Sequence, residues 1–246
     1  MGQPLSWWCA RRPRSILTIV KLISIFLNLG VPLLATAISA AAPPAPDVHA
    51  IAQAVDERYN HLHSLQAEFT EIYRGAGTER TESGTLWLKK PGKMRWEYRS
   101  PREKLFLSDG RDAWFYVPGE RQVRRTAVKK LEDLRSPLAF LLGKTKLEKE
   151  LQGLSLVRDP VPDVGPLASG DVVVMGVPRS LAERVSQVSL EITPEHWISR
   201  ILIEEVDGSV TEYRFTNQRE NVAVSGEQFK FAVPDGVEVI DGELGQ

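Results

Sequence analysis

The chain has 246 residues, of which 42% are hydrophobic and 26% are charged, and its formal net charge is −1. This balance is typical of a globular protein and excludes a disordered or fibrous chain. A chain of this length forms one large domain or two small ones. We find no internal repeat and no low-complexity linker, so the sequence predicts one domain after the N-terminal region.

The N-terminal region has the pattern of an export signal. Four basic residues precede an apolar run from Leu22 to about Ile38, and small residues and a proline-rich stretch follow. This order predicts a signal peptide over residues 1–41, cleaved between about 37 and 42, and a single domain over residues 42–246. The alternative is an uncleaved membrane anchor, because the run is long enough to span a bilayer. Asn28, Gly30 and Pro32 interrupt that run.

Cleavage would change the character of the chain. Loss of the four basic side chains takes the formal net charge from −1 to −5, and an acidic exported protein is a poor nucleic-acid binder. The only cysteine, Cys9, precedes the apolar run, so the mature chain would depend on its core for stability. A lipid-modified cysteine would follow the run, which argues against a lipoprotein anchor. We expect a soluble protein in the periplasm of a Gram-negative cell.

The first element after this region is a helix. Asp47 is a suitable N-cap, and apolar residues then recur at three- and four-residue spacing up to Leu62. From Leu65 onward the period changes to two, which indicates strands. Tight-turn pairs such as Pro91-Gly92 and Asp109-Gly110 separate them. The strands expected in the first half are Leu65–Arg74, Ser83–Lys89, Lys93–Arg99, Lys104–Ser108, Ala113–Val117 and Arg121–Thr126.

A short apolar helix from Ser136 to Gly143 is expected next, because Ser136-Pro137 is a start signal and Gly143 a stop signal. The strands expected after it are Gly153–Arg158, Asp171–Val177, Val185–Ile192, Trp197–Val206, Val210–Thr216 and a short one near Phe229–Val233. The fold class is therefore mainly β with α. We expect a strongly curved antiparallel sheet of about eleven strands with helices across its concave side.

The chain carries few of the residue patterns that catalysis needs. It has no G-x-S-x-G, P-loop or H-E-x-x-H motif, and the mature part has no cysteine nucleophile. The histidines are scattered, and His61 and His63 cannot share a helix face. We expect no enzyme and no metal site.

Aromatic residues are concentrated in one region. Eight of the sixteen aromatic residues of the mature chain lie between Tyr73 and Tyr116. Met94, Trp96 and Tyr98 share one face of their expected strand, opposite a charged face. They either fill an ordinary sandwich core or line an apolar cavity. The cavity is favoured because methionine and large rings suit adaptable apolar surfaces, and because the helices are too few to cover the sheet.

Basic residues gather after this region, at Arg121, Arg124, Arg125, Lys129 and Lys130. They belong either to a solvated hairpin or to a surface that docks an acidic partner.

The order of the motifs resembles the LolA family of periplasmic outer-membrane lipoprotein carriers. The resemblance rests on four stretches between Leu65 and Gly143: "LQAEFTEIY", "SGTLWLKKPGKMRWEYRSP", "LFLSDGRDAWFYVPGERQV" and "SPLAFLLG". It implies an incomplete, half-open antiparallel barrel closed by helices that act as a lid, around a cavity for acyl chains. It also implies a monomer without cofactor. Triacylated lipoproteins would be its cargo, the inner-membrane LolCDE transporter the donor and the outer-membrane receptor LolB the acceptor.

The resemblance also implies which residues form the site. Those facing acyl chains or the lid would be Met94, Trp96, Tyr98, Phe106, Leu138, Phe140, Leu141, Ile51 and Val55. Arg121, Arg124 and Arg125 would dock a partner. The family typically has an arginine before the proline of "LKKPGK", thought to latch the lid, and this chain has Lys90. Lysine keeps the charge but lacks the planar fork of arginine, so we expect a looser lid.

Other functions stay open at this stage. A lipid- or lipoprotein-binding sensor could use the same type of sheet, although we would expect a second domain. The outer-membrane receptor would need a lipidated cysteine after the apolar run. A lipid esterase would need a nucleophile and base pair, and a purely structural sandwich would bind no apolar dye.

Overall fold

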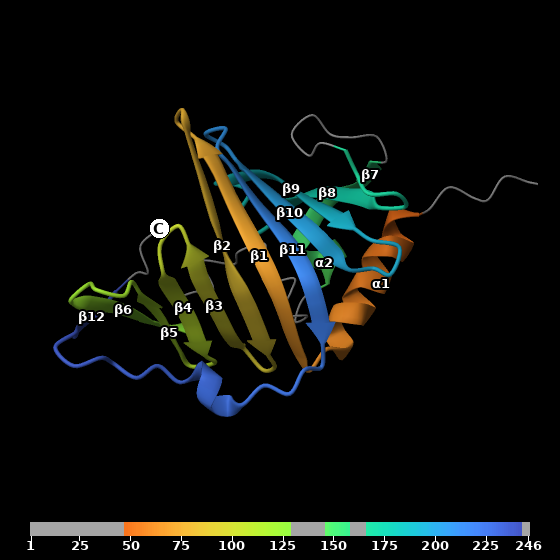
Figure 1. Ribbon diagram of the computed structural model, residues 1–246. Coiled ribbons are helices and arrows are strands. Elements are labelled where there is room, and N and C mark those ends of the chain that lie inside the picture. Colours follow the sequence, from red (N-terminus) through yellow and green to blue (C-terminus); the bar gives the residue numbers. More distant parts are fainter. Residues whose placement is uncertain (1–46, 129–145, 158–165, 243–246) are drawn as a thin grey trace, which may run out of the picture. The chain divides into compact units, whose positions relative to one another are not determined.

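The computed structural model describes residues 47–128, 146–157 and 166–242 (Figure 1). They form one sheet of twelve strands in the order β12-β6-β5-β4-β3-β2-β1-β11-β10-β9-β8-β7. Every neighbouring pair is antiparallel except β12 with β6, which is parallel. The two outermost strands are not paired with each other, so the sheet is open. The expectation of a mainly β, half-open antiparallel architecture is confirmed.

The strand bounds follow the alternation of the sequence closely. The helical segments are α1 (Val48–His61), α2 (Leu147–Glu150) and η3 (Gly226–Phe229). The strands are β1 (Ser64–Gly75), β2 (Thr78–Lys89), β3 (Lys93–Ser100), β4 (Lys104–Asp109), β5 (Asp112–Tyr116), β6 (Gln122–Ala127), β7 (Leu151–Val157), β8 (Val172–Pro178), β9 (Val185–Ile192), β10 (Ile198–Glu205), β11 (Val210–Glu220) and β12 (Glu238–Asp241).

One predicted strand is wrong. Phe229 ends the 3-10 segment η3, and no strand follows it until β12. The Ser225 hydroxyl accepts a hydrogen bond from the backbone N–H of Glu227, which turns the chain at this point. Phe229 is fully buried as the anchor of that turn rather than as part of a ladder. The predicted helix at 136–143 and the predicted signal peptide at 1–41 lie outside the described residues.

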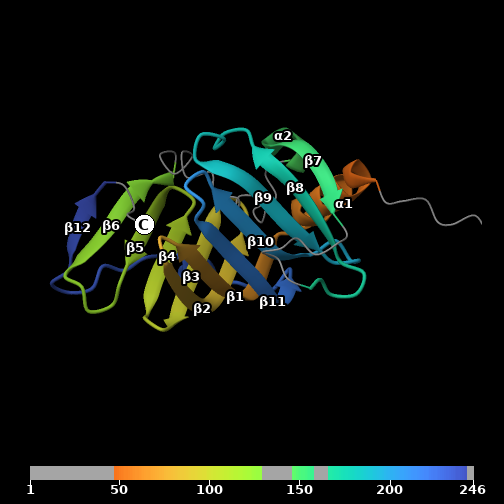
Figure 2. The same ribbon diagram turned by 90° about the horizontal axis from the view of Figure 1, so that it is seen from above.

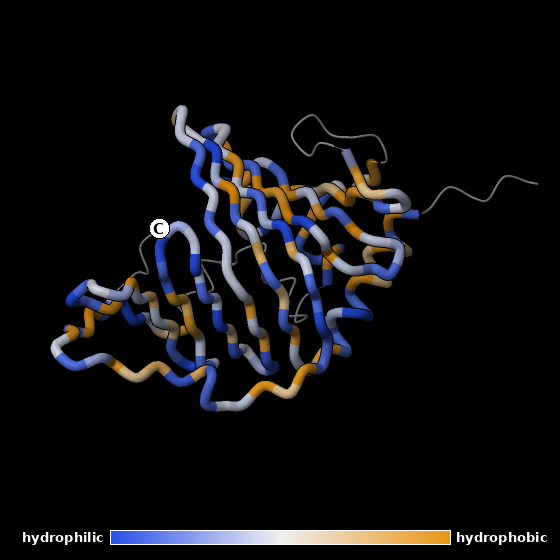
Figure 3. The backbone as a smooth tube through the Cα atoms, in the orientation of Figure 1, coloured by the Kyte–Doolittle hydropathy of each residue, from blue (hydrophilic) through white to orange (hydrophobic). Residues whose placement is uncertain are grey.

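Alternation along the strands gives the sheet two chemically different faces, and orange and blue alternate along the backbone tube in Figure 3. We call the face that packs against α1 the inner face, and the opposite one the outer face. One core cluster joins buried side chains of α1 to the inner face, where it includes Leu65, Phe69, Leu86, Trp96, Leu190 and Ile201. Figures 1 and 2 show α1 beside the end of the sheet that β7 to β11 form.

The start and end of α1 are both fixed. The Asp47 side chain accepts a hydrogen bond from the backbone N–H of His49, as predicted for an N-cap. Ala52, Val55 and Tyr59 are buried against the sheet. The Tyr59 hydroxyl accepts a hydrogen bond of 3.0 Å from the backbone N–H of Ile198 in β10. Helix α1 is therefore tied to the sheet by polar as well as apolar contacts.

Candidate functional site

An aromatic cluster occupies the centre of the inner face. The Phe69 ring lies 4.7 Å from that of Trp96 and 4.9 Å from that of Tyr98, both edge to face. Trp96 also lies 5.8 Å from Tyr213 and 6.3 Å from Phe215. Edge-to-face pairs at these distances add favourable energy beyond the area that they bury. Strands β1, β3 and β11, far apart in sequence, thus build one continuous apolar surface.

The residues predicted on the strands all reach this surface, with different exposure. Trp96 is only 3% exposed and belongs to the core. Met94, Tyr98 and Phe106 are partly buried and pack against that core. On β2, Leu86 and Leu88 are buried on the inner face. The inner face therefore combines a closed aromatic centre with side chains that keep accessible surface.

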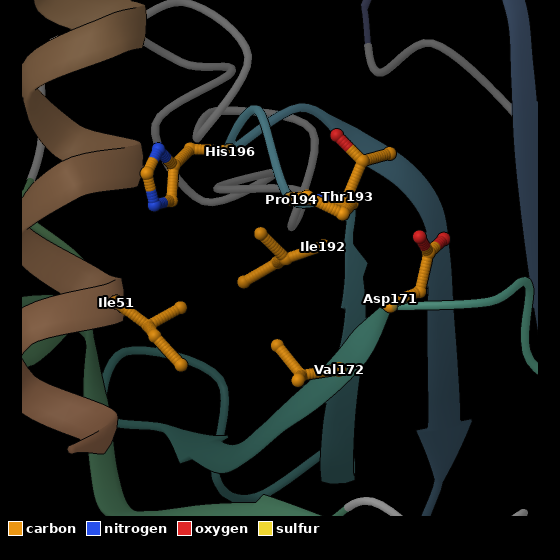
Figure 4. A pocket seen from close by; sticks show the side chains of 8 residues that line it. Ile51, Asp171, Val172, Ile192, Thr193, Pro194 and His196 are labelled. Carbon is orange, nitrogen blue, oxygen red and sulfur yellow. The ribbon is translucent and has the colours of Figure 1, made fainter. Parts of the chain in front are cut away.

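The residues predicted on α1 also face the core. Val55 is buried, and Ile51 is partly buried against the same cluster. Ile51 lines a cavity of about 360 Å³ between α1 and the ends of β8 and β9. Figure 4 shows Ile51 facing Val172 and Ile192 across this cavity. Leu138, Phe140 and Leu141 lie outside the described residues, so their place in a lid stays a prediction.

Polar side chains also line this cavity. Asp171, Thr193 and His196 lie beside the four apolar side chains, those of Ile51, Val172, Ile192 and Pro194. Burial, together with the neighbouring carboxylate of Glu191, raises the pKa of Asp171 to about 6. The lining thus combines apolar side chains with a few polar ones.

Lys90 reaches the end of α1. Its Nζ donates hydrogen bonds to the carbonyl oxygens of Tyr59 and Asn60, at 2.7 and 2.9 Å. These carbonyls belong to the last turn of the helix, where backbone acceptors lack partners and a positive charge is favourable. Burial lowers the pKa of Lys90. The geometry gives Lys90 contacts suited to a latch, although that role stays a prediction.

The three arginines predicted as a docking surface do not form one set. Arg121 and Arg124 are exposed on and beside β6. Arg125 instead forms two hydrogen bonds with the carboxylate of Asp241 in β12, at 2.7 and 2.9 Å. Its guanidinium also lies 5.4 Å from the centre of the Trp114 ring. Arg125 thus holds β12 beside β6, and a docking role for the three arginines stays a prediction.

Sequence reasoning missed a group of charged residues on the inner face. Glu71 and Glu82 are both buried there, directly opposite each other on β1 and β2. The Tyr98 hydroxyl donates a hydrogen bond to Glu71, and Lys104 donates one to Glu82. The available signal was positional, since Glu71 follows Phe69 by two residues and so shares its face.

The described residues hold neither a group of metal ligands nor a membrane-spanning helix. Within the described ranges, no three His, Cys, Asp or Glu side chains gather closely enough to hold a metal ion. Across those same ranges, no helix has the length and apolar character needed to cross a bilayer. The features that stand out are thus the apolar inner face and the cavity beside α1.

These features define a class of protein: an open antiparallel sheet whose apolar inner face is partly covered by a helix. The sequence profile of the family described as "Outer membrane lipoprotein carrier protein LolA" matches residues 60–232, which is more than half of the chain. The chain belongs to this family.

Two sequence relatives support the assignment. An outer-membrane lipoprotein carrier protein of Nitrosospira multiformis is 31% identical over 73% of this chain and 83% of its own length. The protein of the same name from Pectobacterium carotovorum is 30% identical over 75% of this chain and 84% of its own length. Among solved structures, a LolA superfamily protein of Nitrosomonas europaea overlaps 76% of this chain and 99% of its own, with 14% identity and a TM-score of 0.42.

Proposed function

We propose that the protein is a periplasmic carrier that accepts lipoproteins released from the inner membrane, shields their acyl chains on its inner face and delivers them to an outer-membrane receptor. The donor would be the LolCDE transporter and the acceptor LolB. Family membership supports the cargo class, and the resemblance of the sequence supports the two membrane partners. No bond is made or broken in this role, so no catalytic residue is required.

The observation that carries the proposal is the apolar inner face. Met94, Tyr98 and Phe106 are only partly buried, although they lie against a closed aromatic core. Partly exposed apolar side chains grouped on one surface mark a site for an apolar ligand. The cavity beside Ile51 adds a second apolar region at the other end of the core, about 360 Å³ in volume.

The energetics favour partial burial of the cargo. Each buried methylene contributes about 0.8 kcal/mol, so complete burial of several long chains would make release extremely slow. A carrier must hold its cargo less strongly than a membrane does. A self-packed aromatic centre meets this need, because Trp96 and Phe69 must be displaced, or the chains must lie on the more exposed residues around them.

The proposal is tested by release of a triacylated lipoprotein from inner-membrane vesicles that contain the transporter and ATP. The purified protein should appear in a soluble complex with one lipoprotein. Ile51→Trp, which fills the cavity, should reduce loading severalfold. Gln53→Trp, on the exposed side of the same helix, is the matched control and should load normally.

Absence of any complex, with the transporter shown to release lipoprotein to its own carrier, would contradict the carrier role. Binding of lipid without release from vesicles would instead favour the sensor function. Equal loading of both tryptophan variants would show that the cavity beside α1 takes no acyl chain.

A further inference from the structure

The inner face changes from apolar to polar along its strands. Near the start of β1, the row that contains Leu65 continues with Leu88 on β2 and Met94 on β3, so it is apolar. Further along β1, the row contains Glu71 and, directly opposite on β2, Glu82. A ligand with hydrocarbon chains and a polar head matches this change when its head lies at the Glu71 end of the face.

The charges at the polar end balance one another. Lys104 forms an ion pair with Glu82, and the guanidinium of Arg80 lies 3.7 Å from the carboxylate of Glu82. Both cations also act electrostatically on Glu71, to which the Tyr98 hydroxyl donates a hydrogen bond. The two carboxylates and the two cations are neutral together, so this end of the face holds no net charge for a ligand ion to balance.

Tyr213 joins the aromatic cluster to this polar end. On β11 it lies directly opposite Glu71 of β1, and its ring lies 5.8 Å from that of Trp96 and stacks on Phe215 at 6.4 Å. Its hydroxyl forms no hydrogen bond with any residue that the structure describes. Burial, together with the carboxylates of Glu71 and Glu82, raises the pKa of Tyr213, so the hydroxyl stays protonated and can donate.

Packing alone does not account for a tyrosine at this position. Phenylalanine would make the same ring contacts with Trp96 and Phe215. A hydroxyl placed among apolar rings without a hydrogen-bond partner lowers stability. Features that lower stability without structural compensation are found at functional sites. The partner that the Tyr213 hydroxyl lacks is an acceptor, and its place beside the aromatic cluster favours an acceptor that is joined to hydrocarbon.

We infer that the Tyr213 hydroxyl donates a hydrogen bond to an ester carbonyl oxygen at the head of the bound acyl chains. This rests on the proposed carrier function and adds to it a residue that recognises and orients the cargo. An ester carbonyl that leaves water for the apolar face loses its donors, and Tyr213 replaces one of them. The chains then run from Tyr213 past Trp96 toward Met94, and the polar head lies beside Glu71.

The test compares two synthetic probes that differ only in the carbonyl oxygens. Both are short peptides with an N-terminal cysteine, which bears a dipalmitoylglyceryl group on sulfur in one probe and the matching dihexadecyl ether in the other. The ratio of the ester to the ether affinity should fall about fivefold in Tyr213→Phe, because only the ester probe loses a hydrogen bond. Tyr116→Phe, which removes a hydroxyl from the outer face, is the matched control and should keep the ratio.

Unfolding in urea separates this role from a structural one. Without ligand, Tyr213→Phe should unfold at the same urea concentration as the unaltered protein or at a higher one. Tyr98→Phe should unfold at a lower one, because it loses the hydrogen bond to Glu71. An unchanged affinity ratio in Tyr213→Phe, or a loss of stability as large as that of Tyr98→Phe, would overturn the inference while leaving the carrier role standing. Failure of both probes to bind the unaltered protein would contradict the carrier role as well.

Discussion

The ammonium group of Lys90 lies 2.7 Å from the carbonyl oxygen of Tyr59, in the last turn of α1. The same group bonds the carbonyl of Asn60, so one side chain from the β2–β3 turn joins the sheet to the helix. An ammonium has three donors and therefore reaches two carbonyls without the planar fork of arginine. Lys90 thus connects the β2–β3 turn to the last turn of α1.

Replacing Lys90 tests what this connection contributes. Lys90→Met should lower the free energy of unfolding by about 1–2 kcal/mol, because two carbonyls of α1 lose a charged donor. Lys90→Arg should keep most of the stability and should retain loaded cargo longer, since its fork can bond more than two acceptors. Urea unfolding measures the first effect and cargo release the second. Unchanged cargo retention in Lys90→Arg would show that this position does not control the lid.

Tyr59 makes a second connection between α1 and the sheet. Tyr59→Phe should lower the free energy of unfolding by about 1–3 kcal/mol, because the buried N–H of Ile198 loses its acceptor. Tyr116→Phe, which removes a hydroxyl from the outer face, should cost much less. Thermal or urea unfolding measures the loss of stability in each variant. Equal losses would mean that the Tyr59–Ile198 hydrogen bond contributes little to stability.

Gly84 permits close approach of two strands. A Cβ atom added to Gly84 would lie 1.8 Å from the carbonyl oxygen of Glu97 in β3. Gly84→Ala should therefore destabilise the protein by at least about 2 kcal/mol, because neither backbone can move without disturbing the ladder. Gly226→Ala, where no atom lies within 4 Å of the added carbon, is the control. Comparable stability of the two variants would contradict the close packing of β2 and β3.

The raised pKa of Asp171 predicts how the stability of the protein changes with pH. Its pKa is about 6 in the folded protein against 3.8 for a free side chain, so the folded state binds the proton more tightly. The free energy of unfolding should fall as pH rises from about 4 to about 6, and the loss should persist above that range. Asp171→Asn removes the charge and should therefore raise the melting temperature at pH 7 but not below pH 4.

Melting curves at the two pH values test this prediction. Asp235→Asn, an exposed aspartate, is the control and should show no such difference. A melting temperature of Asp171→Asn that is unchanged or lower at pH 7 would mean that Arg200 and other neighbours stabilise the ionised carboxylate.

Most strands and turns could be predicted because each is determined by residues that are neighbours in the sequence. The alternation around Trp96 and the turn at Pro91-Gly92 define β3 and its start without knowledge of distant residues. β12 could not be found in this way. It has four residues and depends on parallel pairing with β6 and on the Arg125–Asp241 contact, which are both distant in sequence.

In the candidate site, too, local patterns reveal some residues, whereas contacts between distant residues could not be predicted. Met94, Trp96 and Tyr98 could be assigned to one face by their spacing, and Lys90 by the resemblance to a family. The hydrogen-bond partner of Glu71 could not, because the Tyr98 hydroxyl reaches it from β3. The Asp241 partner of Arg125 could not be predicted either, since a separation of 116 positions gives no local signal.

The central claim is that acyl chains lie on the inner face, and a photocrosslinking residue can locate them. A benzophenone amino acid at Phe106, on the inner face, should crosslink to an acyl chain of bound lipoprotein, as mass spectrometry of the adduct would show. The same residue at Tyr116, on the outer face beside Phe231, should not. Equal crosslinking at both positions, or none at Phe106 in a complex that demonstrably contains the lipoprotein, would contradict the account.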